Sequence, residues 1–227
     1  MNDIHPTAVI GDRVRLGRGN AIGPFAVLMG DVEIGDDNWI GAGVVIGAPP
    51  EVRSFEHPRK PGDAMGHGVV VGSANVIRES AQIHGGLFAP TRVGDGCFLM
   101  NQVYVAHDGD VGDAVTMASS VLLAGHVHVG AGANLGLGAK VHQFRSIGAV
   151  AMVGMGSIVT RDVPPFAMVY GAPARVRGAN RVGLERRGVS AAAVDLIDTA
   201  YRTSSEHDLA RVKLPAEVAR LLAAASA

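Results

Sequence analysis

An aliphatic residue recurs at every sixth position over most of the first 160 residues, and a glycine often follows it. This spacing matches neither the 3.6-residue period of an α-helix nor the two-residue alternation of a half-buried strand. It is the hexapeptide pattern of a parallel β-helix, an all-β solenoid in which three hexads complete one triangular coil. Residues about 18 apart are therefore expected to stack at the inter-strand spacing of roughly 4.8 Å. The pattern runs through Ile4, Ile10, Leu16, Ile22, Leu28, Ile34, Ile40 and Ile46, through Val71, Ile77 and Ile83, and from Val93 by sixes to Val159.

Two breaks in the hexads predict segments that leave the solenoid as loops. The first covers about residues 48–68, which hold four prolines and several charges, and the second covers 85–90. Such residues cannot line a narrow apolar interior, so we expect the coil to resume after each of them. Loops that project from a rigid scaffold often carry substrate contacts.

The C-terminal part predicts a short cap. Consecutive prolines cannot donate to a strand ladder, so Asp162–Pro165 is expected to end the repeat and to close a β-helix domain over residues 1–165. Residues 166–227 are then a strap, irregular from 171 to 188, followed by a short α-helical cap. Ser190 predicts the N-cap of a helix over Ala191–Arg202, and Pro215 is expected at the start of a last helix.

Composition limits the possible partners and location. The chain has 20 Lys+Arg and 21 Asp+Glu, a formal net charge of −1, so neither nucleic-acid nor membrane attraction is implied. Cys97 is the only cysteine, which excludes an intrachain disulfide and a cysteine zinc site within one chain. Without a leader-like start or a span of ~18 apolar residues, a cytoplasmic protein with no membrane span is expected. The flat solenoid sides predict a homotrimer around a threefold axis.

The 18-residue spacing gathers polar side chains on one edge of the solenoid. Starting from His107, one coil further gives Gly125 with His126 beside it, and a second coil gives Gln143 with His142 beside it. An imidazole can serve as a general base near neutral pH, and the adjacent Asp108 can orient it. A glycine allows a carbonyl to approach its backbone N–H, which can stabilise an oxyanion. This grouping predicts acyl transfer to a hydroxyl or amine.

At these residues the chain resembles the acyl-ACP:UDP-N-acetylglucosamine O-acyltransferases of lipid A synthesis, where ACP is acyl carrier protein. The shared strings cover nearly the whole chain in order: Ile-His-Pro-Thr-Ala at 4–8, Ile-Gly-Pro-Phe at 22–25, Ile-Arg-Glu-Ser at 77–80, Val-Ala-His-Asp at 105–108, Leu-Ala-Gly-His-Val at 123–127, Val-His-Gln-Phe at 141–144, Asp-Val-Pro-Pro at 162–165 and Gly-Leu-Glu-Arg-Arg-Gly at 183–188. The resemblance implies left-handed coils, an acyl-ACP donor, a UDP-sugar acceptor, no metal or other cofactor, and active sites between the subunits of a homotrimer.

The resemblance also implies roles for individual residues. His107 is the general base, Asp108 supports it, and the Gly125 amide forms the oxyanion hole. The expected substrate-binding residues in addition to these are His126, His142, Gln143, Asn180, Arg186, Arg187, Arg53, Tyr104, Arg78 and His84. Arginines 175, 177, 181, 186 and 187 form a local basic patch suited to nucleotide phosphates or to an acidic carrier protein. Met155 stands where a bulky residue is expected to shorten the acyl chain.

The chain departs from the family mainly in its acceptor loop. Glu51-Val52-Arg53-Ser54-Phe55 replaces the family's usual Gln-Asp-Leu-Lys-Tyr, so the Asp and Lys are missing and Arg53 is the candidate replacement. Tyr104 stands where another histidine is common, and the loop after His84 is shorter and lacks an arginine.

Three alternatives remain open at this point. One is a related acyltransferase that uses another nucleotide sugar or an acyl-CoA donor. A second is a γ-type carbonic anhydrase, which needs three zinc-binding histidines, two of them five residues apart in that family. His107, His126 and His142 do not have this spacing. The third is a scaffold that has lost catalytic activity.

Overall fold

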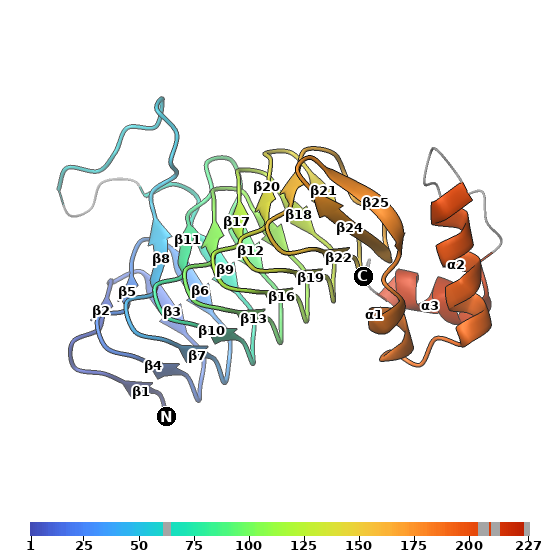
Figure 1. The fold of residues 1–227 in the computed structure, drawn as a ribbon. Helices are drawn as coiled ribbons and strands as arrows, with labels where there is room; N and C mark the ends of the chain where they lie inside the picture. The colour runs from blue at the N-terminus through green and yellow to red at the C-terminus, as the bar shows by residue number, and fades with distance from the viewer. Residues whose placement is uncertain (61–64, 204–208, 210–213, 225–227) are drawn as a thin grey trace.

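The chain folds into a long prism with three flat faces and a helical cap at its C-terminal end (Figure 1). The structure is a computed structural model that describes residues 1–60, 65–203, 209 and 214–224. Each face is a sheet of short strands, all parallel except the last strand of face A, and the chain passes from face A to face B to face C before it begins the next coil.

The strands are assigned to the faces as follows in the described part of the chain. Face A consists of β1 (Asp3–Ile4), β4 (Ala21–Ile22), β7 (Trp39–Ile40), β10 (Val76–Ile77), β13 (Phe98–Leu99), β16 (Thr116–Met117), β19 (Asn134–Leu135), β22 (Met152–Val153), β24 (Ala167–Gly171) and β25 (Ala174–Ala179). Face B consists of β2 (Val9–Ile10), β5 (Val27–Leu28), β8 (Val45–Ala48), β11 (Gln82–His84), β14 (Tyr104–Val105), β17 (Leu122–Leu123), β20 (Lys140–Val141) and β23 (Ile158–Val159). Face C consists of β3 (Val14–Leu16), β6 (Val32–Ile34), β9 (Val69–Val71), β12 (Thr91–Val93), β15 (Asp110–Val111), β18 (His128–Val129) and β21 (Ser146–Ile147).

The turns between strands form three edges, named AB, BC and CA after the faces that they join. The AB edge includes residues 78–81, 136–139 and 154–157, the BC edge includes 106–109, 124–127 and 142–145, and the CA edge includes 94–97, 112–115 and 130–133. Each edge therefore presents a column of turns, one for each coil.

The register confirms the spacing that the hexads predict. Thr116 pairs with Asn134 on face A, Leu122 with Lys140 on face B and His128 with Ser146 on face C, each 18 residues apart. The aliphatic residues of the pattern point inward and are almost completely buried from Ile22 onward. Ile4 is an exception at 40% exposed, because no coil lies beneath the first one to cover it.

Both predicted breaks leave the solenoid at the BC edge. The first break begins after Ala48, which still belongs to β8, and its described residues are 49–60 and 65–68. The second break covers residues 85–90, between β11 and β12. Each loop connects a face B strand to the following face C strand. The insertions therefore project beside the edge on which the histidines are expected.

The sheet continues past Pro165, where the sequence predicted that the repeat ends. Val163 still bridges Ile147, and β24 pairs in parallel with β22. The prolines lie in a turn, where no ladder N–H is required, so they do not interrupt the sheet. The segment expected to be an irregular strap is instead ordered, because β25 pairs antiparallel with β24 as a hairpin.

The cap contains α1 (Arg181–Glu185), α2 (Ala191–Thr203) and α3 (Ala216–Ala224). Both predicted helices are confirmed: the Ser190 hydroxyl accepts the Ala193 N–H at the start of α2, and α3 begins one residue after Pro215. The buried face of α2 packs against β25, and the Tyr201 hydroxyl donates to the Pro165 carbonyl. The cap is thereby fixed to the last coils.

Candidate active site

The BC edge stacks the predicted residues on successive coils. The His126 N–H donates to the His107 carbonyl at 3.1 Å, and the Phe144 N–H donates to the Gly125 carbonyl at the same distance. These bonds hold one turn directly over the next, which places His107, Gly125 and Gln143 in one column. The structure thus brings together the core of the site that the 18-residue spacing predicts.

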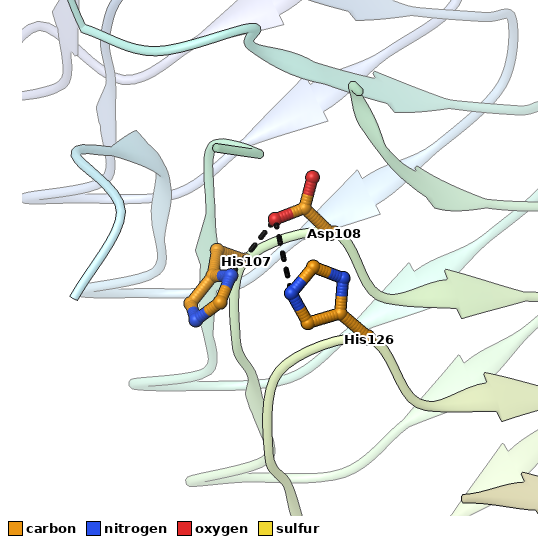
Figure 2. Close-up of side chains that lie close together, drawn as sticks. All are labelled: His107, Asp108 and His126. Carbon is orange, nitrogen blue, oxygen red and sulfur yellow. Dashed lines mark hydrogen bonds and ion pairs between the residues drawn. The ribbon is translucent and has the colours of Figure 1, made fainter. Parts of the chain in front are cut away.

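His107 and Asp108 form a hydrogen-bonded pair at the centre of this edge. The His107 Nδ1 lies 2.8 Å from Asp108 Oδ2, and their side chains are 15% and 6% exposed. A carboxylate can only accept, so Nδ1 carries the proton of this bond and Nε2 is left as the basic nitrogen. Figure 2 shows the rings of His107 and His126 converging on the same Asp108 oxygen.

Asp108 also binds the backbone of the second loop. Its carboxylate accepts the N–H groups of Leu87, Phe88 and Ala89 at 3.0, 2.8 and 2.9 Å. Burial alone would raise the pKa of Asp108, but the bonds from His107 and from the three N–H groups outweigh it and lower the pKa to about 2. Asp108 therefore stays ionised, and it holds both the His107 ring and the 85–90 loop.

Gly125 lies directly against the His107 ring. A Cβ at Gly125 would lie 2.6 Å from His107 Cε1 and 2.7 Å from Nε2, so only glycine fits over the imidazole without displacing it. The Gly125 N–H has no hydrogen-bond partner among the described residues. The edge therefore offers a basic nitrogen and a free backbone donor in adjacent turns.

His126 is packed between aromatic rings and next to His107. Its ring lies edge-on to His107, with centroids 5.1 Å apart, and its Nε2 is 3.9 Å from Asp108 Oδ2. Phe144 stacks on one face of the His126 ring at 4.5 Å with an interplanar angle of 7°, and Phe88 lies at 5.9 Å with an angle of 27°. These contacts hold the ring plane of His126.

One group of side chains at this edge could hold a metal ion: the donor atoms of His107, Asp108 and His126 lie within 4.8 Å of one another. An ion in that place would displace the proton between His107 and Asp108. The oxygens of Asp108 also accept three backbone N–H groups, which weakens them as ligands. The arrangement is better suited to proton transfer than to metal binding.

His142 and Gln143 lie on the same edge, but their side chains point to solvent. Both are exposed, and the His142 Nδ1 is 3.2 Å from the Gln143 carbonyl of its own turn. No hydrogen bond or ring contact among the described residues joins either side chain to His107 or His126. They lie one and two coils from His126 and His107 on this edge without bonding to either.

His84 and Tyr104 hold the base of the first loop. The His84 ring is almost buried, with Nδ1 3.0 Å from the Pro49 carbonyl and Nε2 3.5 Å from the Glu51 carboxylate. The Tyr104 ring packs on it at 5.4 Å. His84 thus supports the loop that carries Arg53, whose side chain is exposed.

Arg78 and Met155 lie on the AB edge, on the far side of face B from His107. Arg78 forms an ion pair with Glu79 at 3.0 Å and lies over the Trp39 ring. Met155 is 73% exposed. A single chain does not bring these two residues to the histidines.

The predicted nucleotide-binding residues belong to the cap, and two of them have structural partners. Asn180 is the N-cap of α1, accepting the Gly183 N–H and donating to the Val150 carbonyl. Arg187 donates to the carbonyls of Gly132 and Gly183.

The predicted basic patch is reduced by ion pairs within the cap. Arg181 binds Asp195 at 2.7 Å, with Asp198 also in range, so its charge is neutralised locally. The side chain of Arg186 is exposed and has no hydrogen-bond or ion-pair partner in the part of the chain that the structure describes, although its backbone N–H donates to the Val182 carbonyl. Arg186 is therefore the arginine of this group most available to a phosphate.

Phe88 and Phe144 were missed from the sequence as site residues. Phe144 lies one coil of 18 residues beyond His126, so the spacing that found the histidines would also have found this ring. Phe88 belongs to a loop outside the register, and no sequence spacing places it against His126.

Family models match two parts of the chain. The second domain of UDP-N-acetylglucosamine O-acyltransferases matches residues 162–225, and the bacterial transferase hexapeptide repeat matches residues 13–48. In the described residues, no helix combines the length and the apolar character needed to cross a membrane.

Relatives and solved structures extend this similarity over the whole chain. An acyl-[acyl-carrier-protein]–UDP-N-acetylglucosamine O-acyltransferase from Paraburkholderia phymatum is 36% identical, over 99% of this chain and 91% of that protein. One of the same name from Synechocystis sp. is 40% identical over 78% of this chain, which spans only 62% of that relative. The crystal structure of a UDP-N-acetylglucosamine acyltransferase from Bacteroides fragilis superposes with a TM-score of 0.81 at 29% identity, covering 98% and 94% of the two chains.

The expected fold, a left-handed parallel β-helix, is confirmed by this match. Fold, register and sequence identity agree along the length of the solenoid and into the cap. The chain therefore belongs to the acyl-[acyl-carrier-protein]–UDP-N-acetylglucosamine O-acyltransferase family.

Proposed function

We propose that the protein transfers a 3-hydroxyacyl group from acyl-ACP to a hydroxyl of UDP-N-acetylglucosamine at the BC edge. The observation that carries this proposal is the His107–Asp108 pair beneath Gly125, whose N–H is free. The relatives named for this reaction support the choice of donor and acceptor.

The geometry supports a single addition and elimination. The His107 Nε2 accepts the proton of the sugar hydroxyl as its oxygen attacks the thioester carbonyl and forms the new C–O bond. The Gly125 N–H donates to the resulting oxyanion. The C–S bond then breaks, and the thiolate of the carrier takes the proton from the imidazolium. Asp108 stabilises that imidazolium through Nδ1.

A homotrimer would complete this site. The outward side chains of face B are largely apolar, including Val9, Leu122 and Ile158, whereas face C carries the Arg15–Glu33 and His128–Asp110 ion pairs. Burying face B around a threefold axis removes the apolar surface from water. Because face B is bounded by the AB and BC edges, the AB edge of one copy then faces the BC edge of the next.

That assembly gives Arg78 and Met155 a role in the neighbouring copy's site. Met155, exposed on the AB edge, would close the far end of the acyl channel and favour chains of medium length. We expect Met155→Gly to shift the preferred donor toward longer acyl chains, measured with a series of acyl-ACPs. An unchanged chain preference would contradict this role.

The loop expected to contact the acceptor raises a second possible function, which needs its own test. Glu51–Phe55 differs from the family's usual loop, and in this chain His84 anchors it through Pro49 and Glu51. The same base could therefore act on another nucleotide sugar, or on an amine acceptor, with an acyl-CoA donor as a further variant. Within the proposed reaction, Arg186 is the first candidate to bind the diphosphate, since Asn180 and Arg187 support the cap.

The test is a transfer assay with the purified protein. Acyl-ACP and acyl-CoA donors are each combined with UDP-N-acetylglucosamine, its 3-amino analogue and other UDP-sugars, and products are identified by mass spectrometry. We expect the highest kcat/KM with acyl-ACP and UDP-N-acetylglucosamine. Turnover with another acceptor alone would show that UDP-N-acetylglucosamine is not the acceptor. A lack of transfer from every donor would refute the proposed activity.

A further inference from the structure

His84 is a buried histidine with one unpaired ring nitrogen. Its side chain is 10% exposed, and Nε2 has no hydrogen-bond partner among the described residues. The other nitrogen, Nδ1, lies 3.0 Å from the Pro49 carbonyl. A carbonyl can only accept, so Nδ1 carries a proton in both charge states of the ring, and Nε2 is the nitrogen that gains or loses one.

The Glu51 carboxylate of the first loop lies 3.5 Å from this Nε2. In the neutral ring, Nε2 is an acceptor that faces another acceptor, so no hydrogen bond forms. In the protonated ring, Nε2 donates to the carboxylate in a charge-assisted bond, which is stronger than a neutral one. The two charge states of His84 therefore differ by one bond between the solenoid and the first loop.

The identity of residue 51 makes this contact depend on pH. The family's usual loop has a glutamine there, whose amide offers both an N–H and a carbonyl oxygen and can bond to either form of the ring. Glu51 can only accept while it is ionised, so it bonds only to the protonated ring. Because a histidine changes charge between about pH 5 and 8, the contact in this chain forms on acidification.

The other groups around His84 do not replace Glu51. Tyr104 of β14 packs on the ring with centroids 5.4 Å apart, while β8 and the second loop contain no ionisable residue. His67 of the first loop is exposed, and Asp108 is bound to its own histidine and to the backbone of the second loop. Among the described residues, Glu51 is the one ion-pair partner of His84.

His84 is fixed to the solenoid, whereas Glu51 belongs to the loop. His84 is the last residue of β11 and pairs with Ala48, the last residue of β8. The first loop starts after Ala48, and Arg53, the candidate for acceptor binding, lies two residues beyond Glu51. A bond that holds Glu51 to the fixed ring therefore restricts the positions available to Arg53.

We propose that His84 and Glu51 form a proton-dependent latch that positions the first loop to bind the acceptor. Both are positioning residues, because they act through the loop and not on the reacting atoms. This inference rests on the proposed function and adds to it a pH-dependent affinity for the nucleotide sugar. The latch closes when His84 is protonated, so affinity for the acceptor rises as the pH falls from about 8 to about 6.

The test follows the loop and the acceptor separately, at about pH 6 and about pH 8. Hydrogen exchange measured by mass spectrometry reports on residues 49–56, and isothermal titration calorimetry gives the Kd of UDP-N-acetylglucosamine. Wild type, Glu51→Gln, Glu51→Ala and Asp110→Asn are compared at each pH, which cancels the chemical pH dependence of exchange. Asp110→Asn is the matched control, because it removes another carboxylate–histidine pair, Asp110 with His128 at 3.1 Å on face C.

We expect wild type and Glu51→Gln to agree at about pH 6, where both contacts are formed. At about pH 8 the loop of the wild type should exchange about threefold faster than that of Glu51→Gln, and its Kd should be about threefold higher, which is the size expected of a partly exposed ion pair. Glu51→Ala should behave at both pH values as the wild type does at the higher one, and Asp110→Asn should follow the wild type.

Equal exchange of this loop in wild type and Glu51→Gln at both pH values would overturn the latch. A loop that responds to pH while the ratio of the two Kd values stays constant would overturn its role in acceptor binding. The proposed function fails separately: if the loop responds as expected but UDP-N-acetylglucosamine is neither bound nor acylated, the latch remains and the proposed acceptor is removed.

Discussion

At the scale of single residues, Asp108 connects the base to the neighbouring loop. One carboxylate orients His107 through Nδ1 and binds three N–H groups of residues 87–89. The ring proposed to take the proton and the loop that carries Phe88 are therefore fixed by the same side chain. A change at Asp108 should alter both of them together.

Gly125 gives the sharpest residue-scale prediction. We expect Gly125→Ala to lower kcat by about 10²-fold or more with the fold intact, because its Cβ would displace the His107 ring. Steady-state kinetics and circular dichroism measure the two effects. Gly96→Ala is the control, since that site has open space and Ala114 has a similar φ one coil above. Equal activity in the two variants would contradict the close packing of Gly125 on His107.

Acid titration of stability tests the state of Asp108. Its lowered pKa, about 2, means that the ionised carboxylate stabilises the folded protein fully above its ordinary value of 3.8, and that this stabilisation is lost as the pH falls toward 2. We predict that wild type and Asp108→Asn differ in unfolding free energy by a constant amount above about pH 4, and that the difference shrinks below it. A difference that grows on acidification would show that Asp108 has a raised pKa.

The residue positions that follow the register could be predicted, and the others could not. The 18-residue spacing placed His126 and Gly125 beside His107, because a β-helix converts sequence separation into height. It could not place residues 87–89 on Asp108, since their loop lies outside the register. The substrate role of Asn180 came from the family resemblance and stays a prediction. In the structure its side chain caps α1, through a contact that no periodicity encodes.

At the scale of elements, the edges and the cap have different tasks. The BC edge carries the proposed catalytic groups and both loops, and the cap closes the last coils through α1 and α2. The hexads predicted the solenoid strands, and Ser190 predicted the start of α2. The β24–β25 hairpin could not be predicted from local sequence, because β24 forms on the open edge of β22 that the solenoid supplies.

The cap contact of Asn180 leads to a prediction about stability. Asn180→Ala should lower the free energy of unfolding by about 1 kcal/mol, because α1 loses its N-cap and the Val150 carbonyl loses a donor. Asn180→Asp keeps the capping oxygen, so its free energy of unfolding should fall by less. Guanidinium denaturation measures both. Unchanged stability together with a raised KM for the UDP-sugar would show that Asn180 binds nucleotide instead.

At the scale of the whole molecule, faces B and C differ in chemistry, since face C carries ion pairs. The apolar face B lies between the edge with the histidines and the edge with Arg78 and Met155. A threefold assembly through face B would both cover that surface and bring the two edges together. The complete substrate cleft is in this view a property of the trimer.

Disruption of face B should therefore abolish assembly and activity together. Leu122→Asp places a charge on this face, where Leu122 is 37% exposed, and we predict a monomer in size-exclusion chromatography with light scattering. Val70→Asp, on face C, is the matched control and should remain a trimer. A wild-type monomer with full activity would refute the shared site.

The most direct test of the account is the turnover of His107→Ala. The acyl-transfer rate of this variant and of the wild type is measured under saturating donor and acceptor, with the mass of both checked by light scattering. We predict the same assembly and a kcat lowered by about 10³-fold, because the sugar hydroxyl loses the base proposed for it. A variant that turns over within about threefold of the wild type would contradict the assignment of His107 as that base.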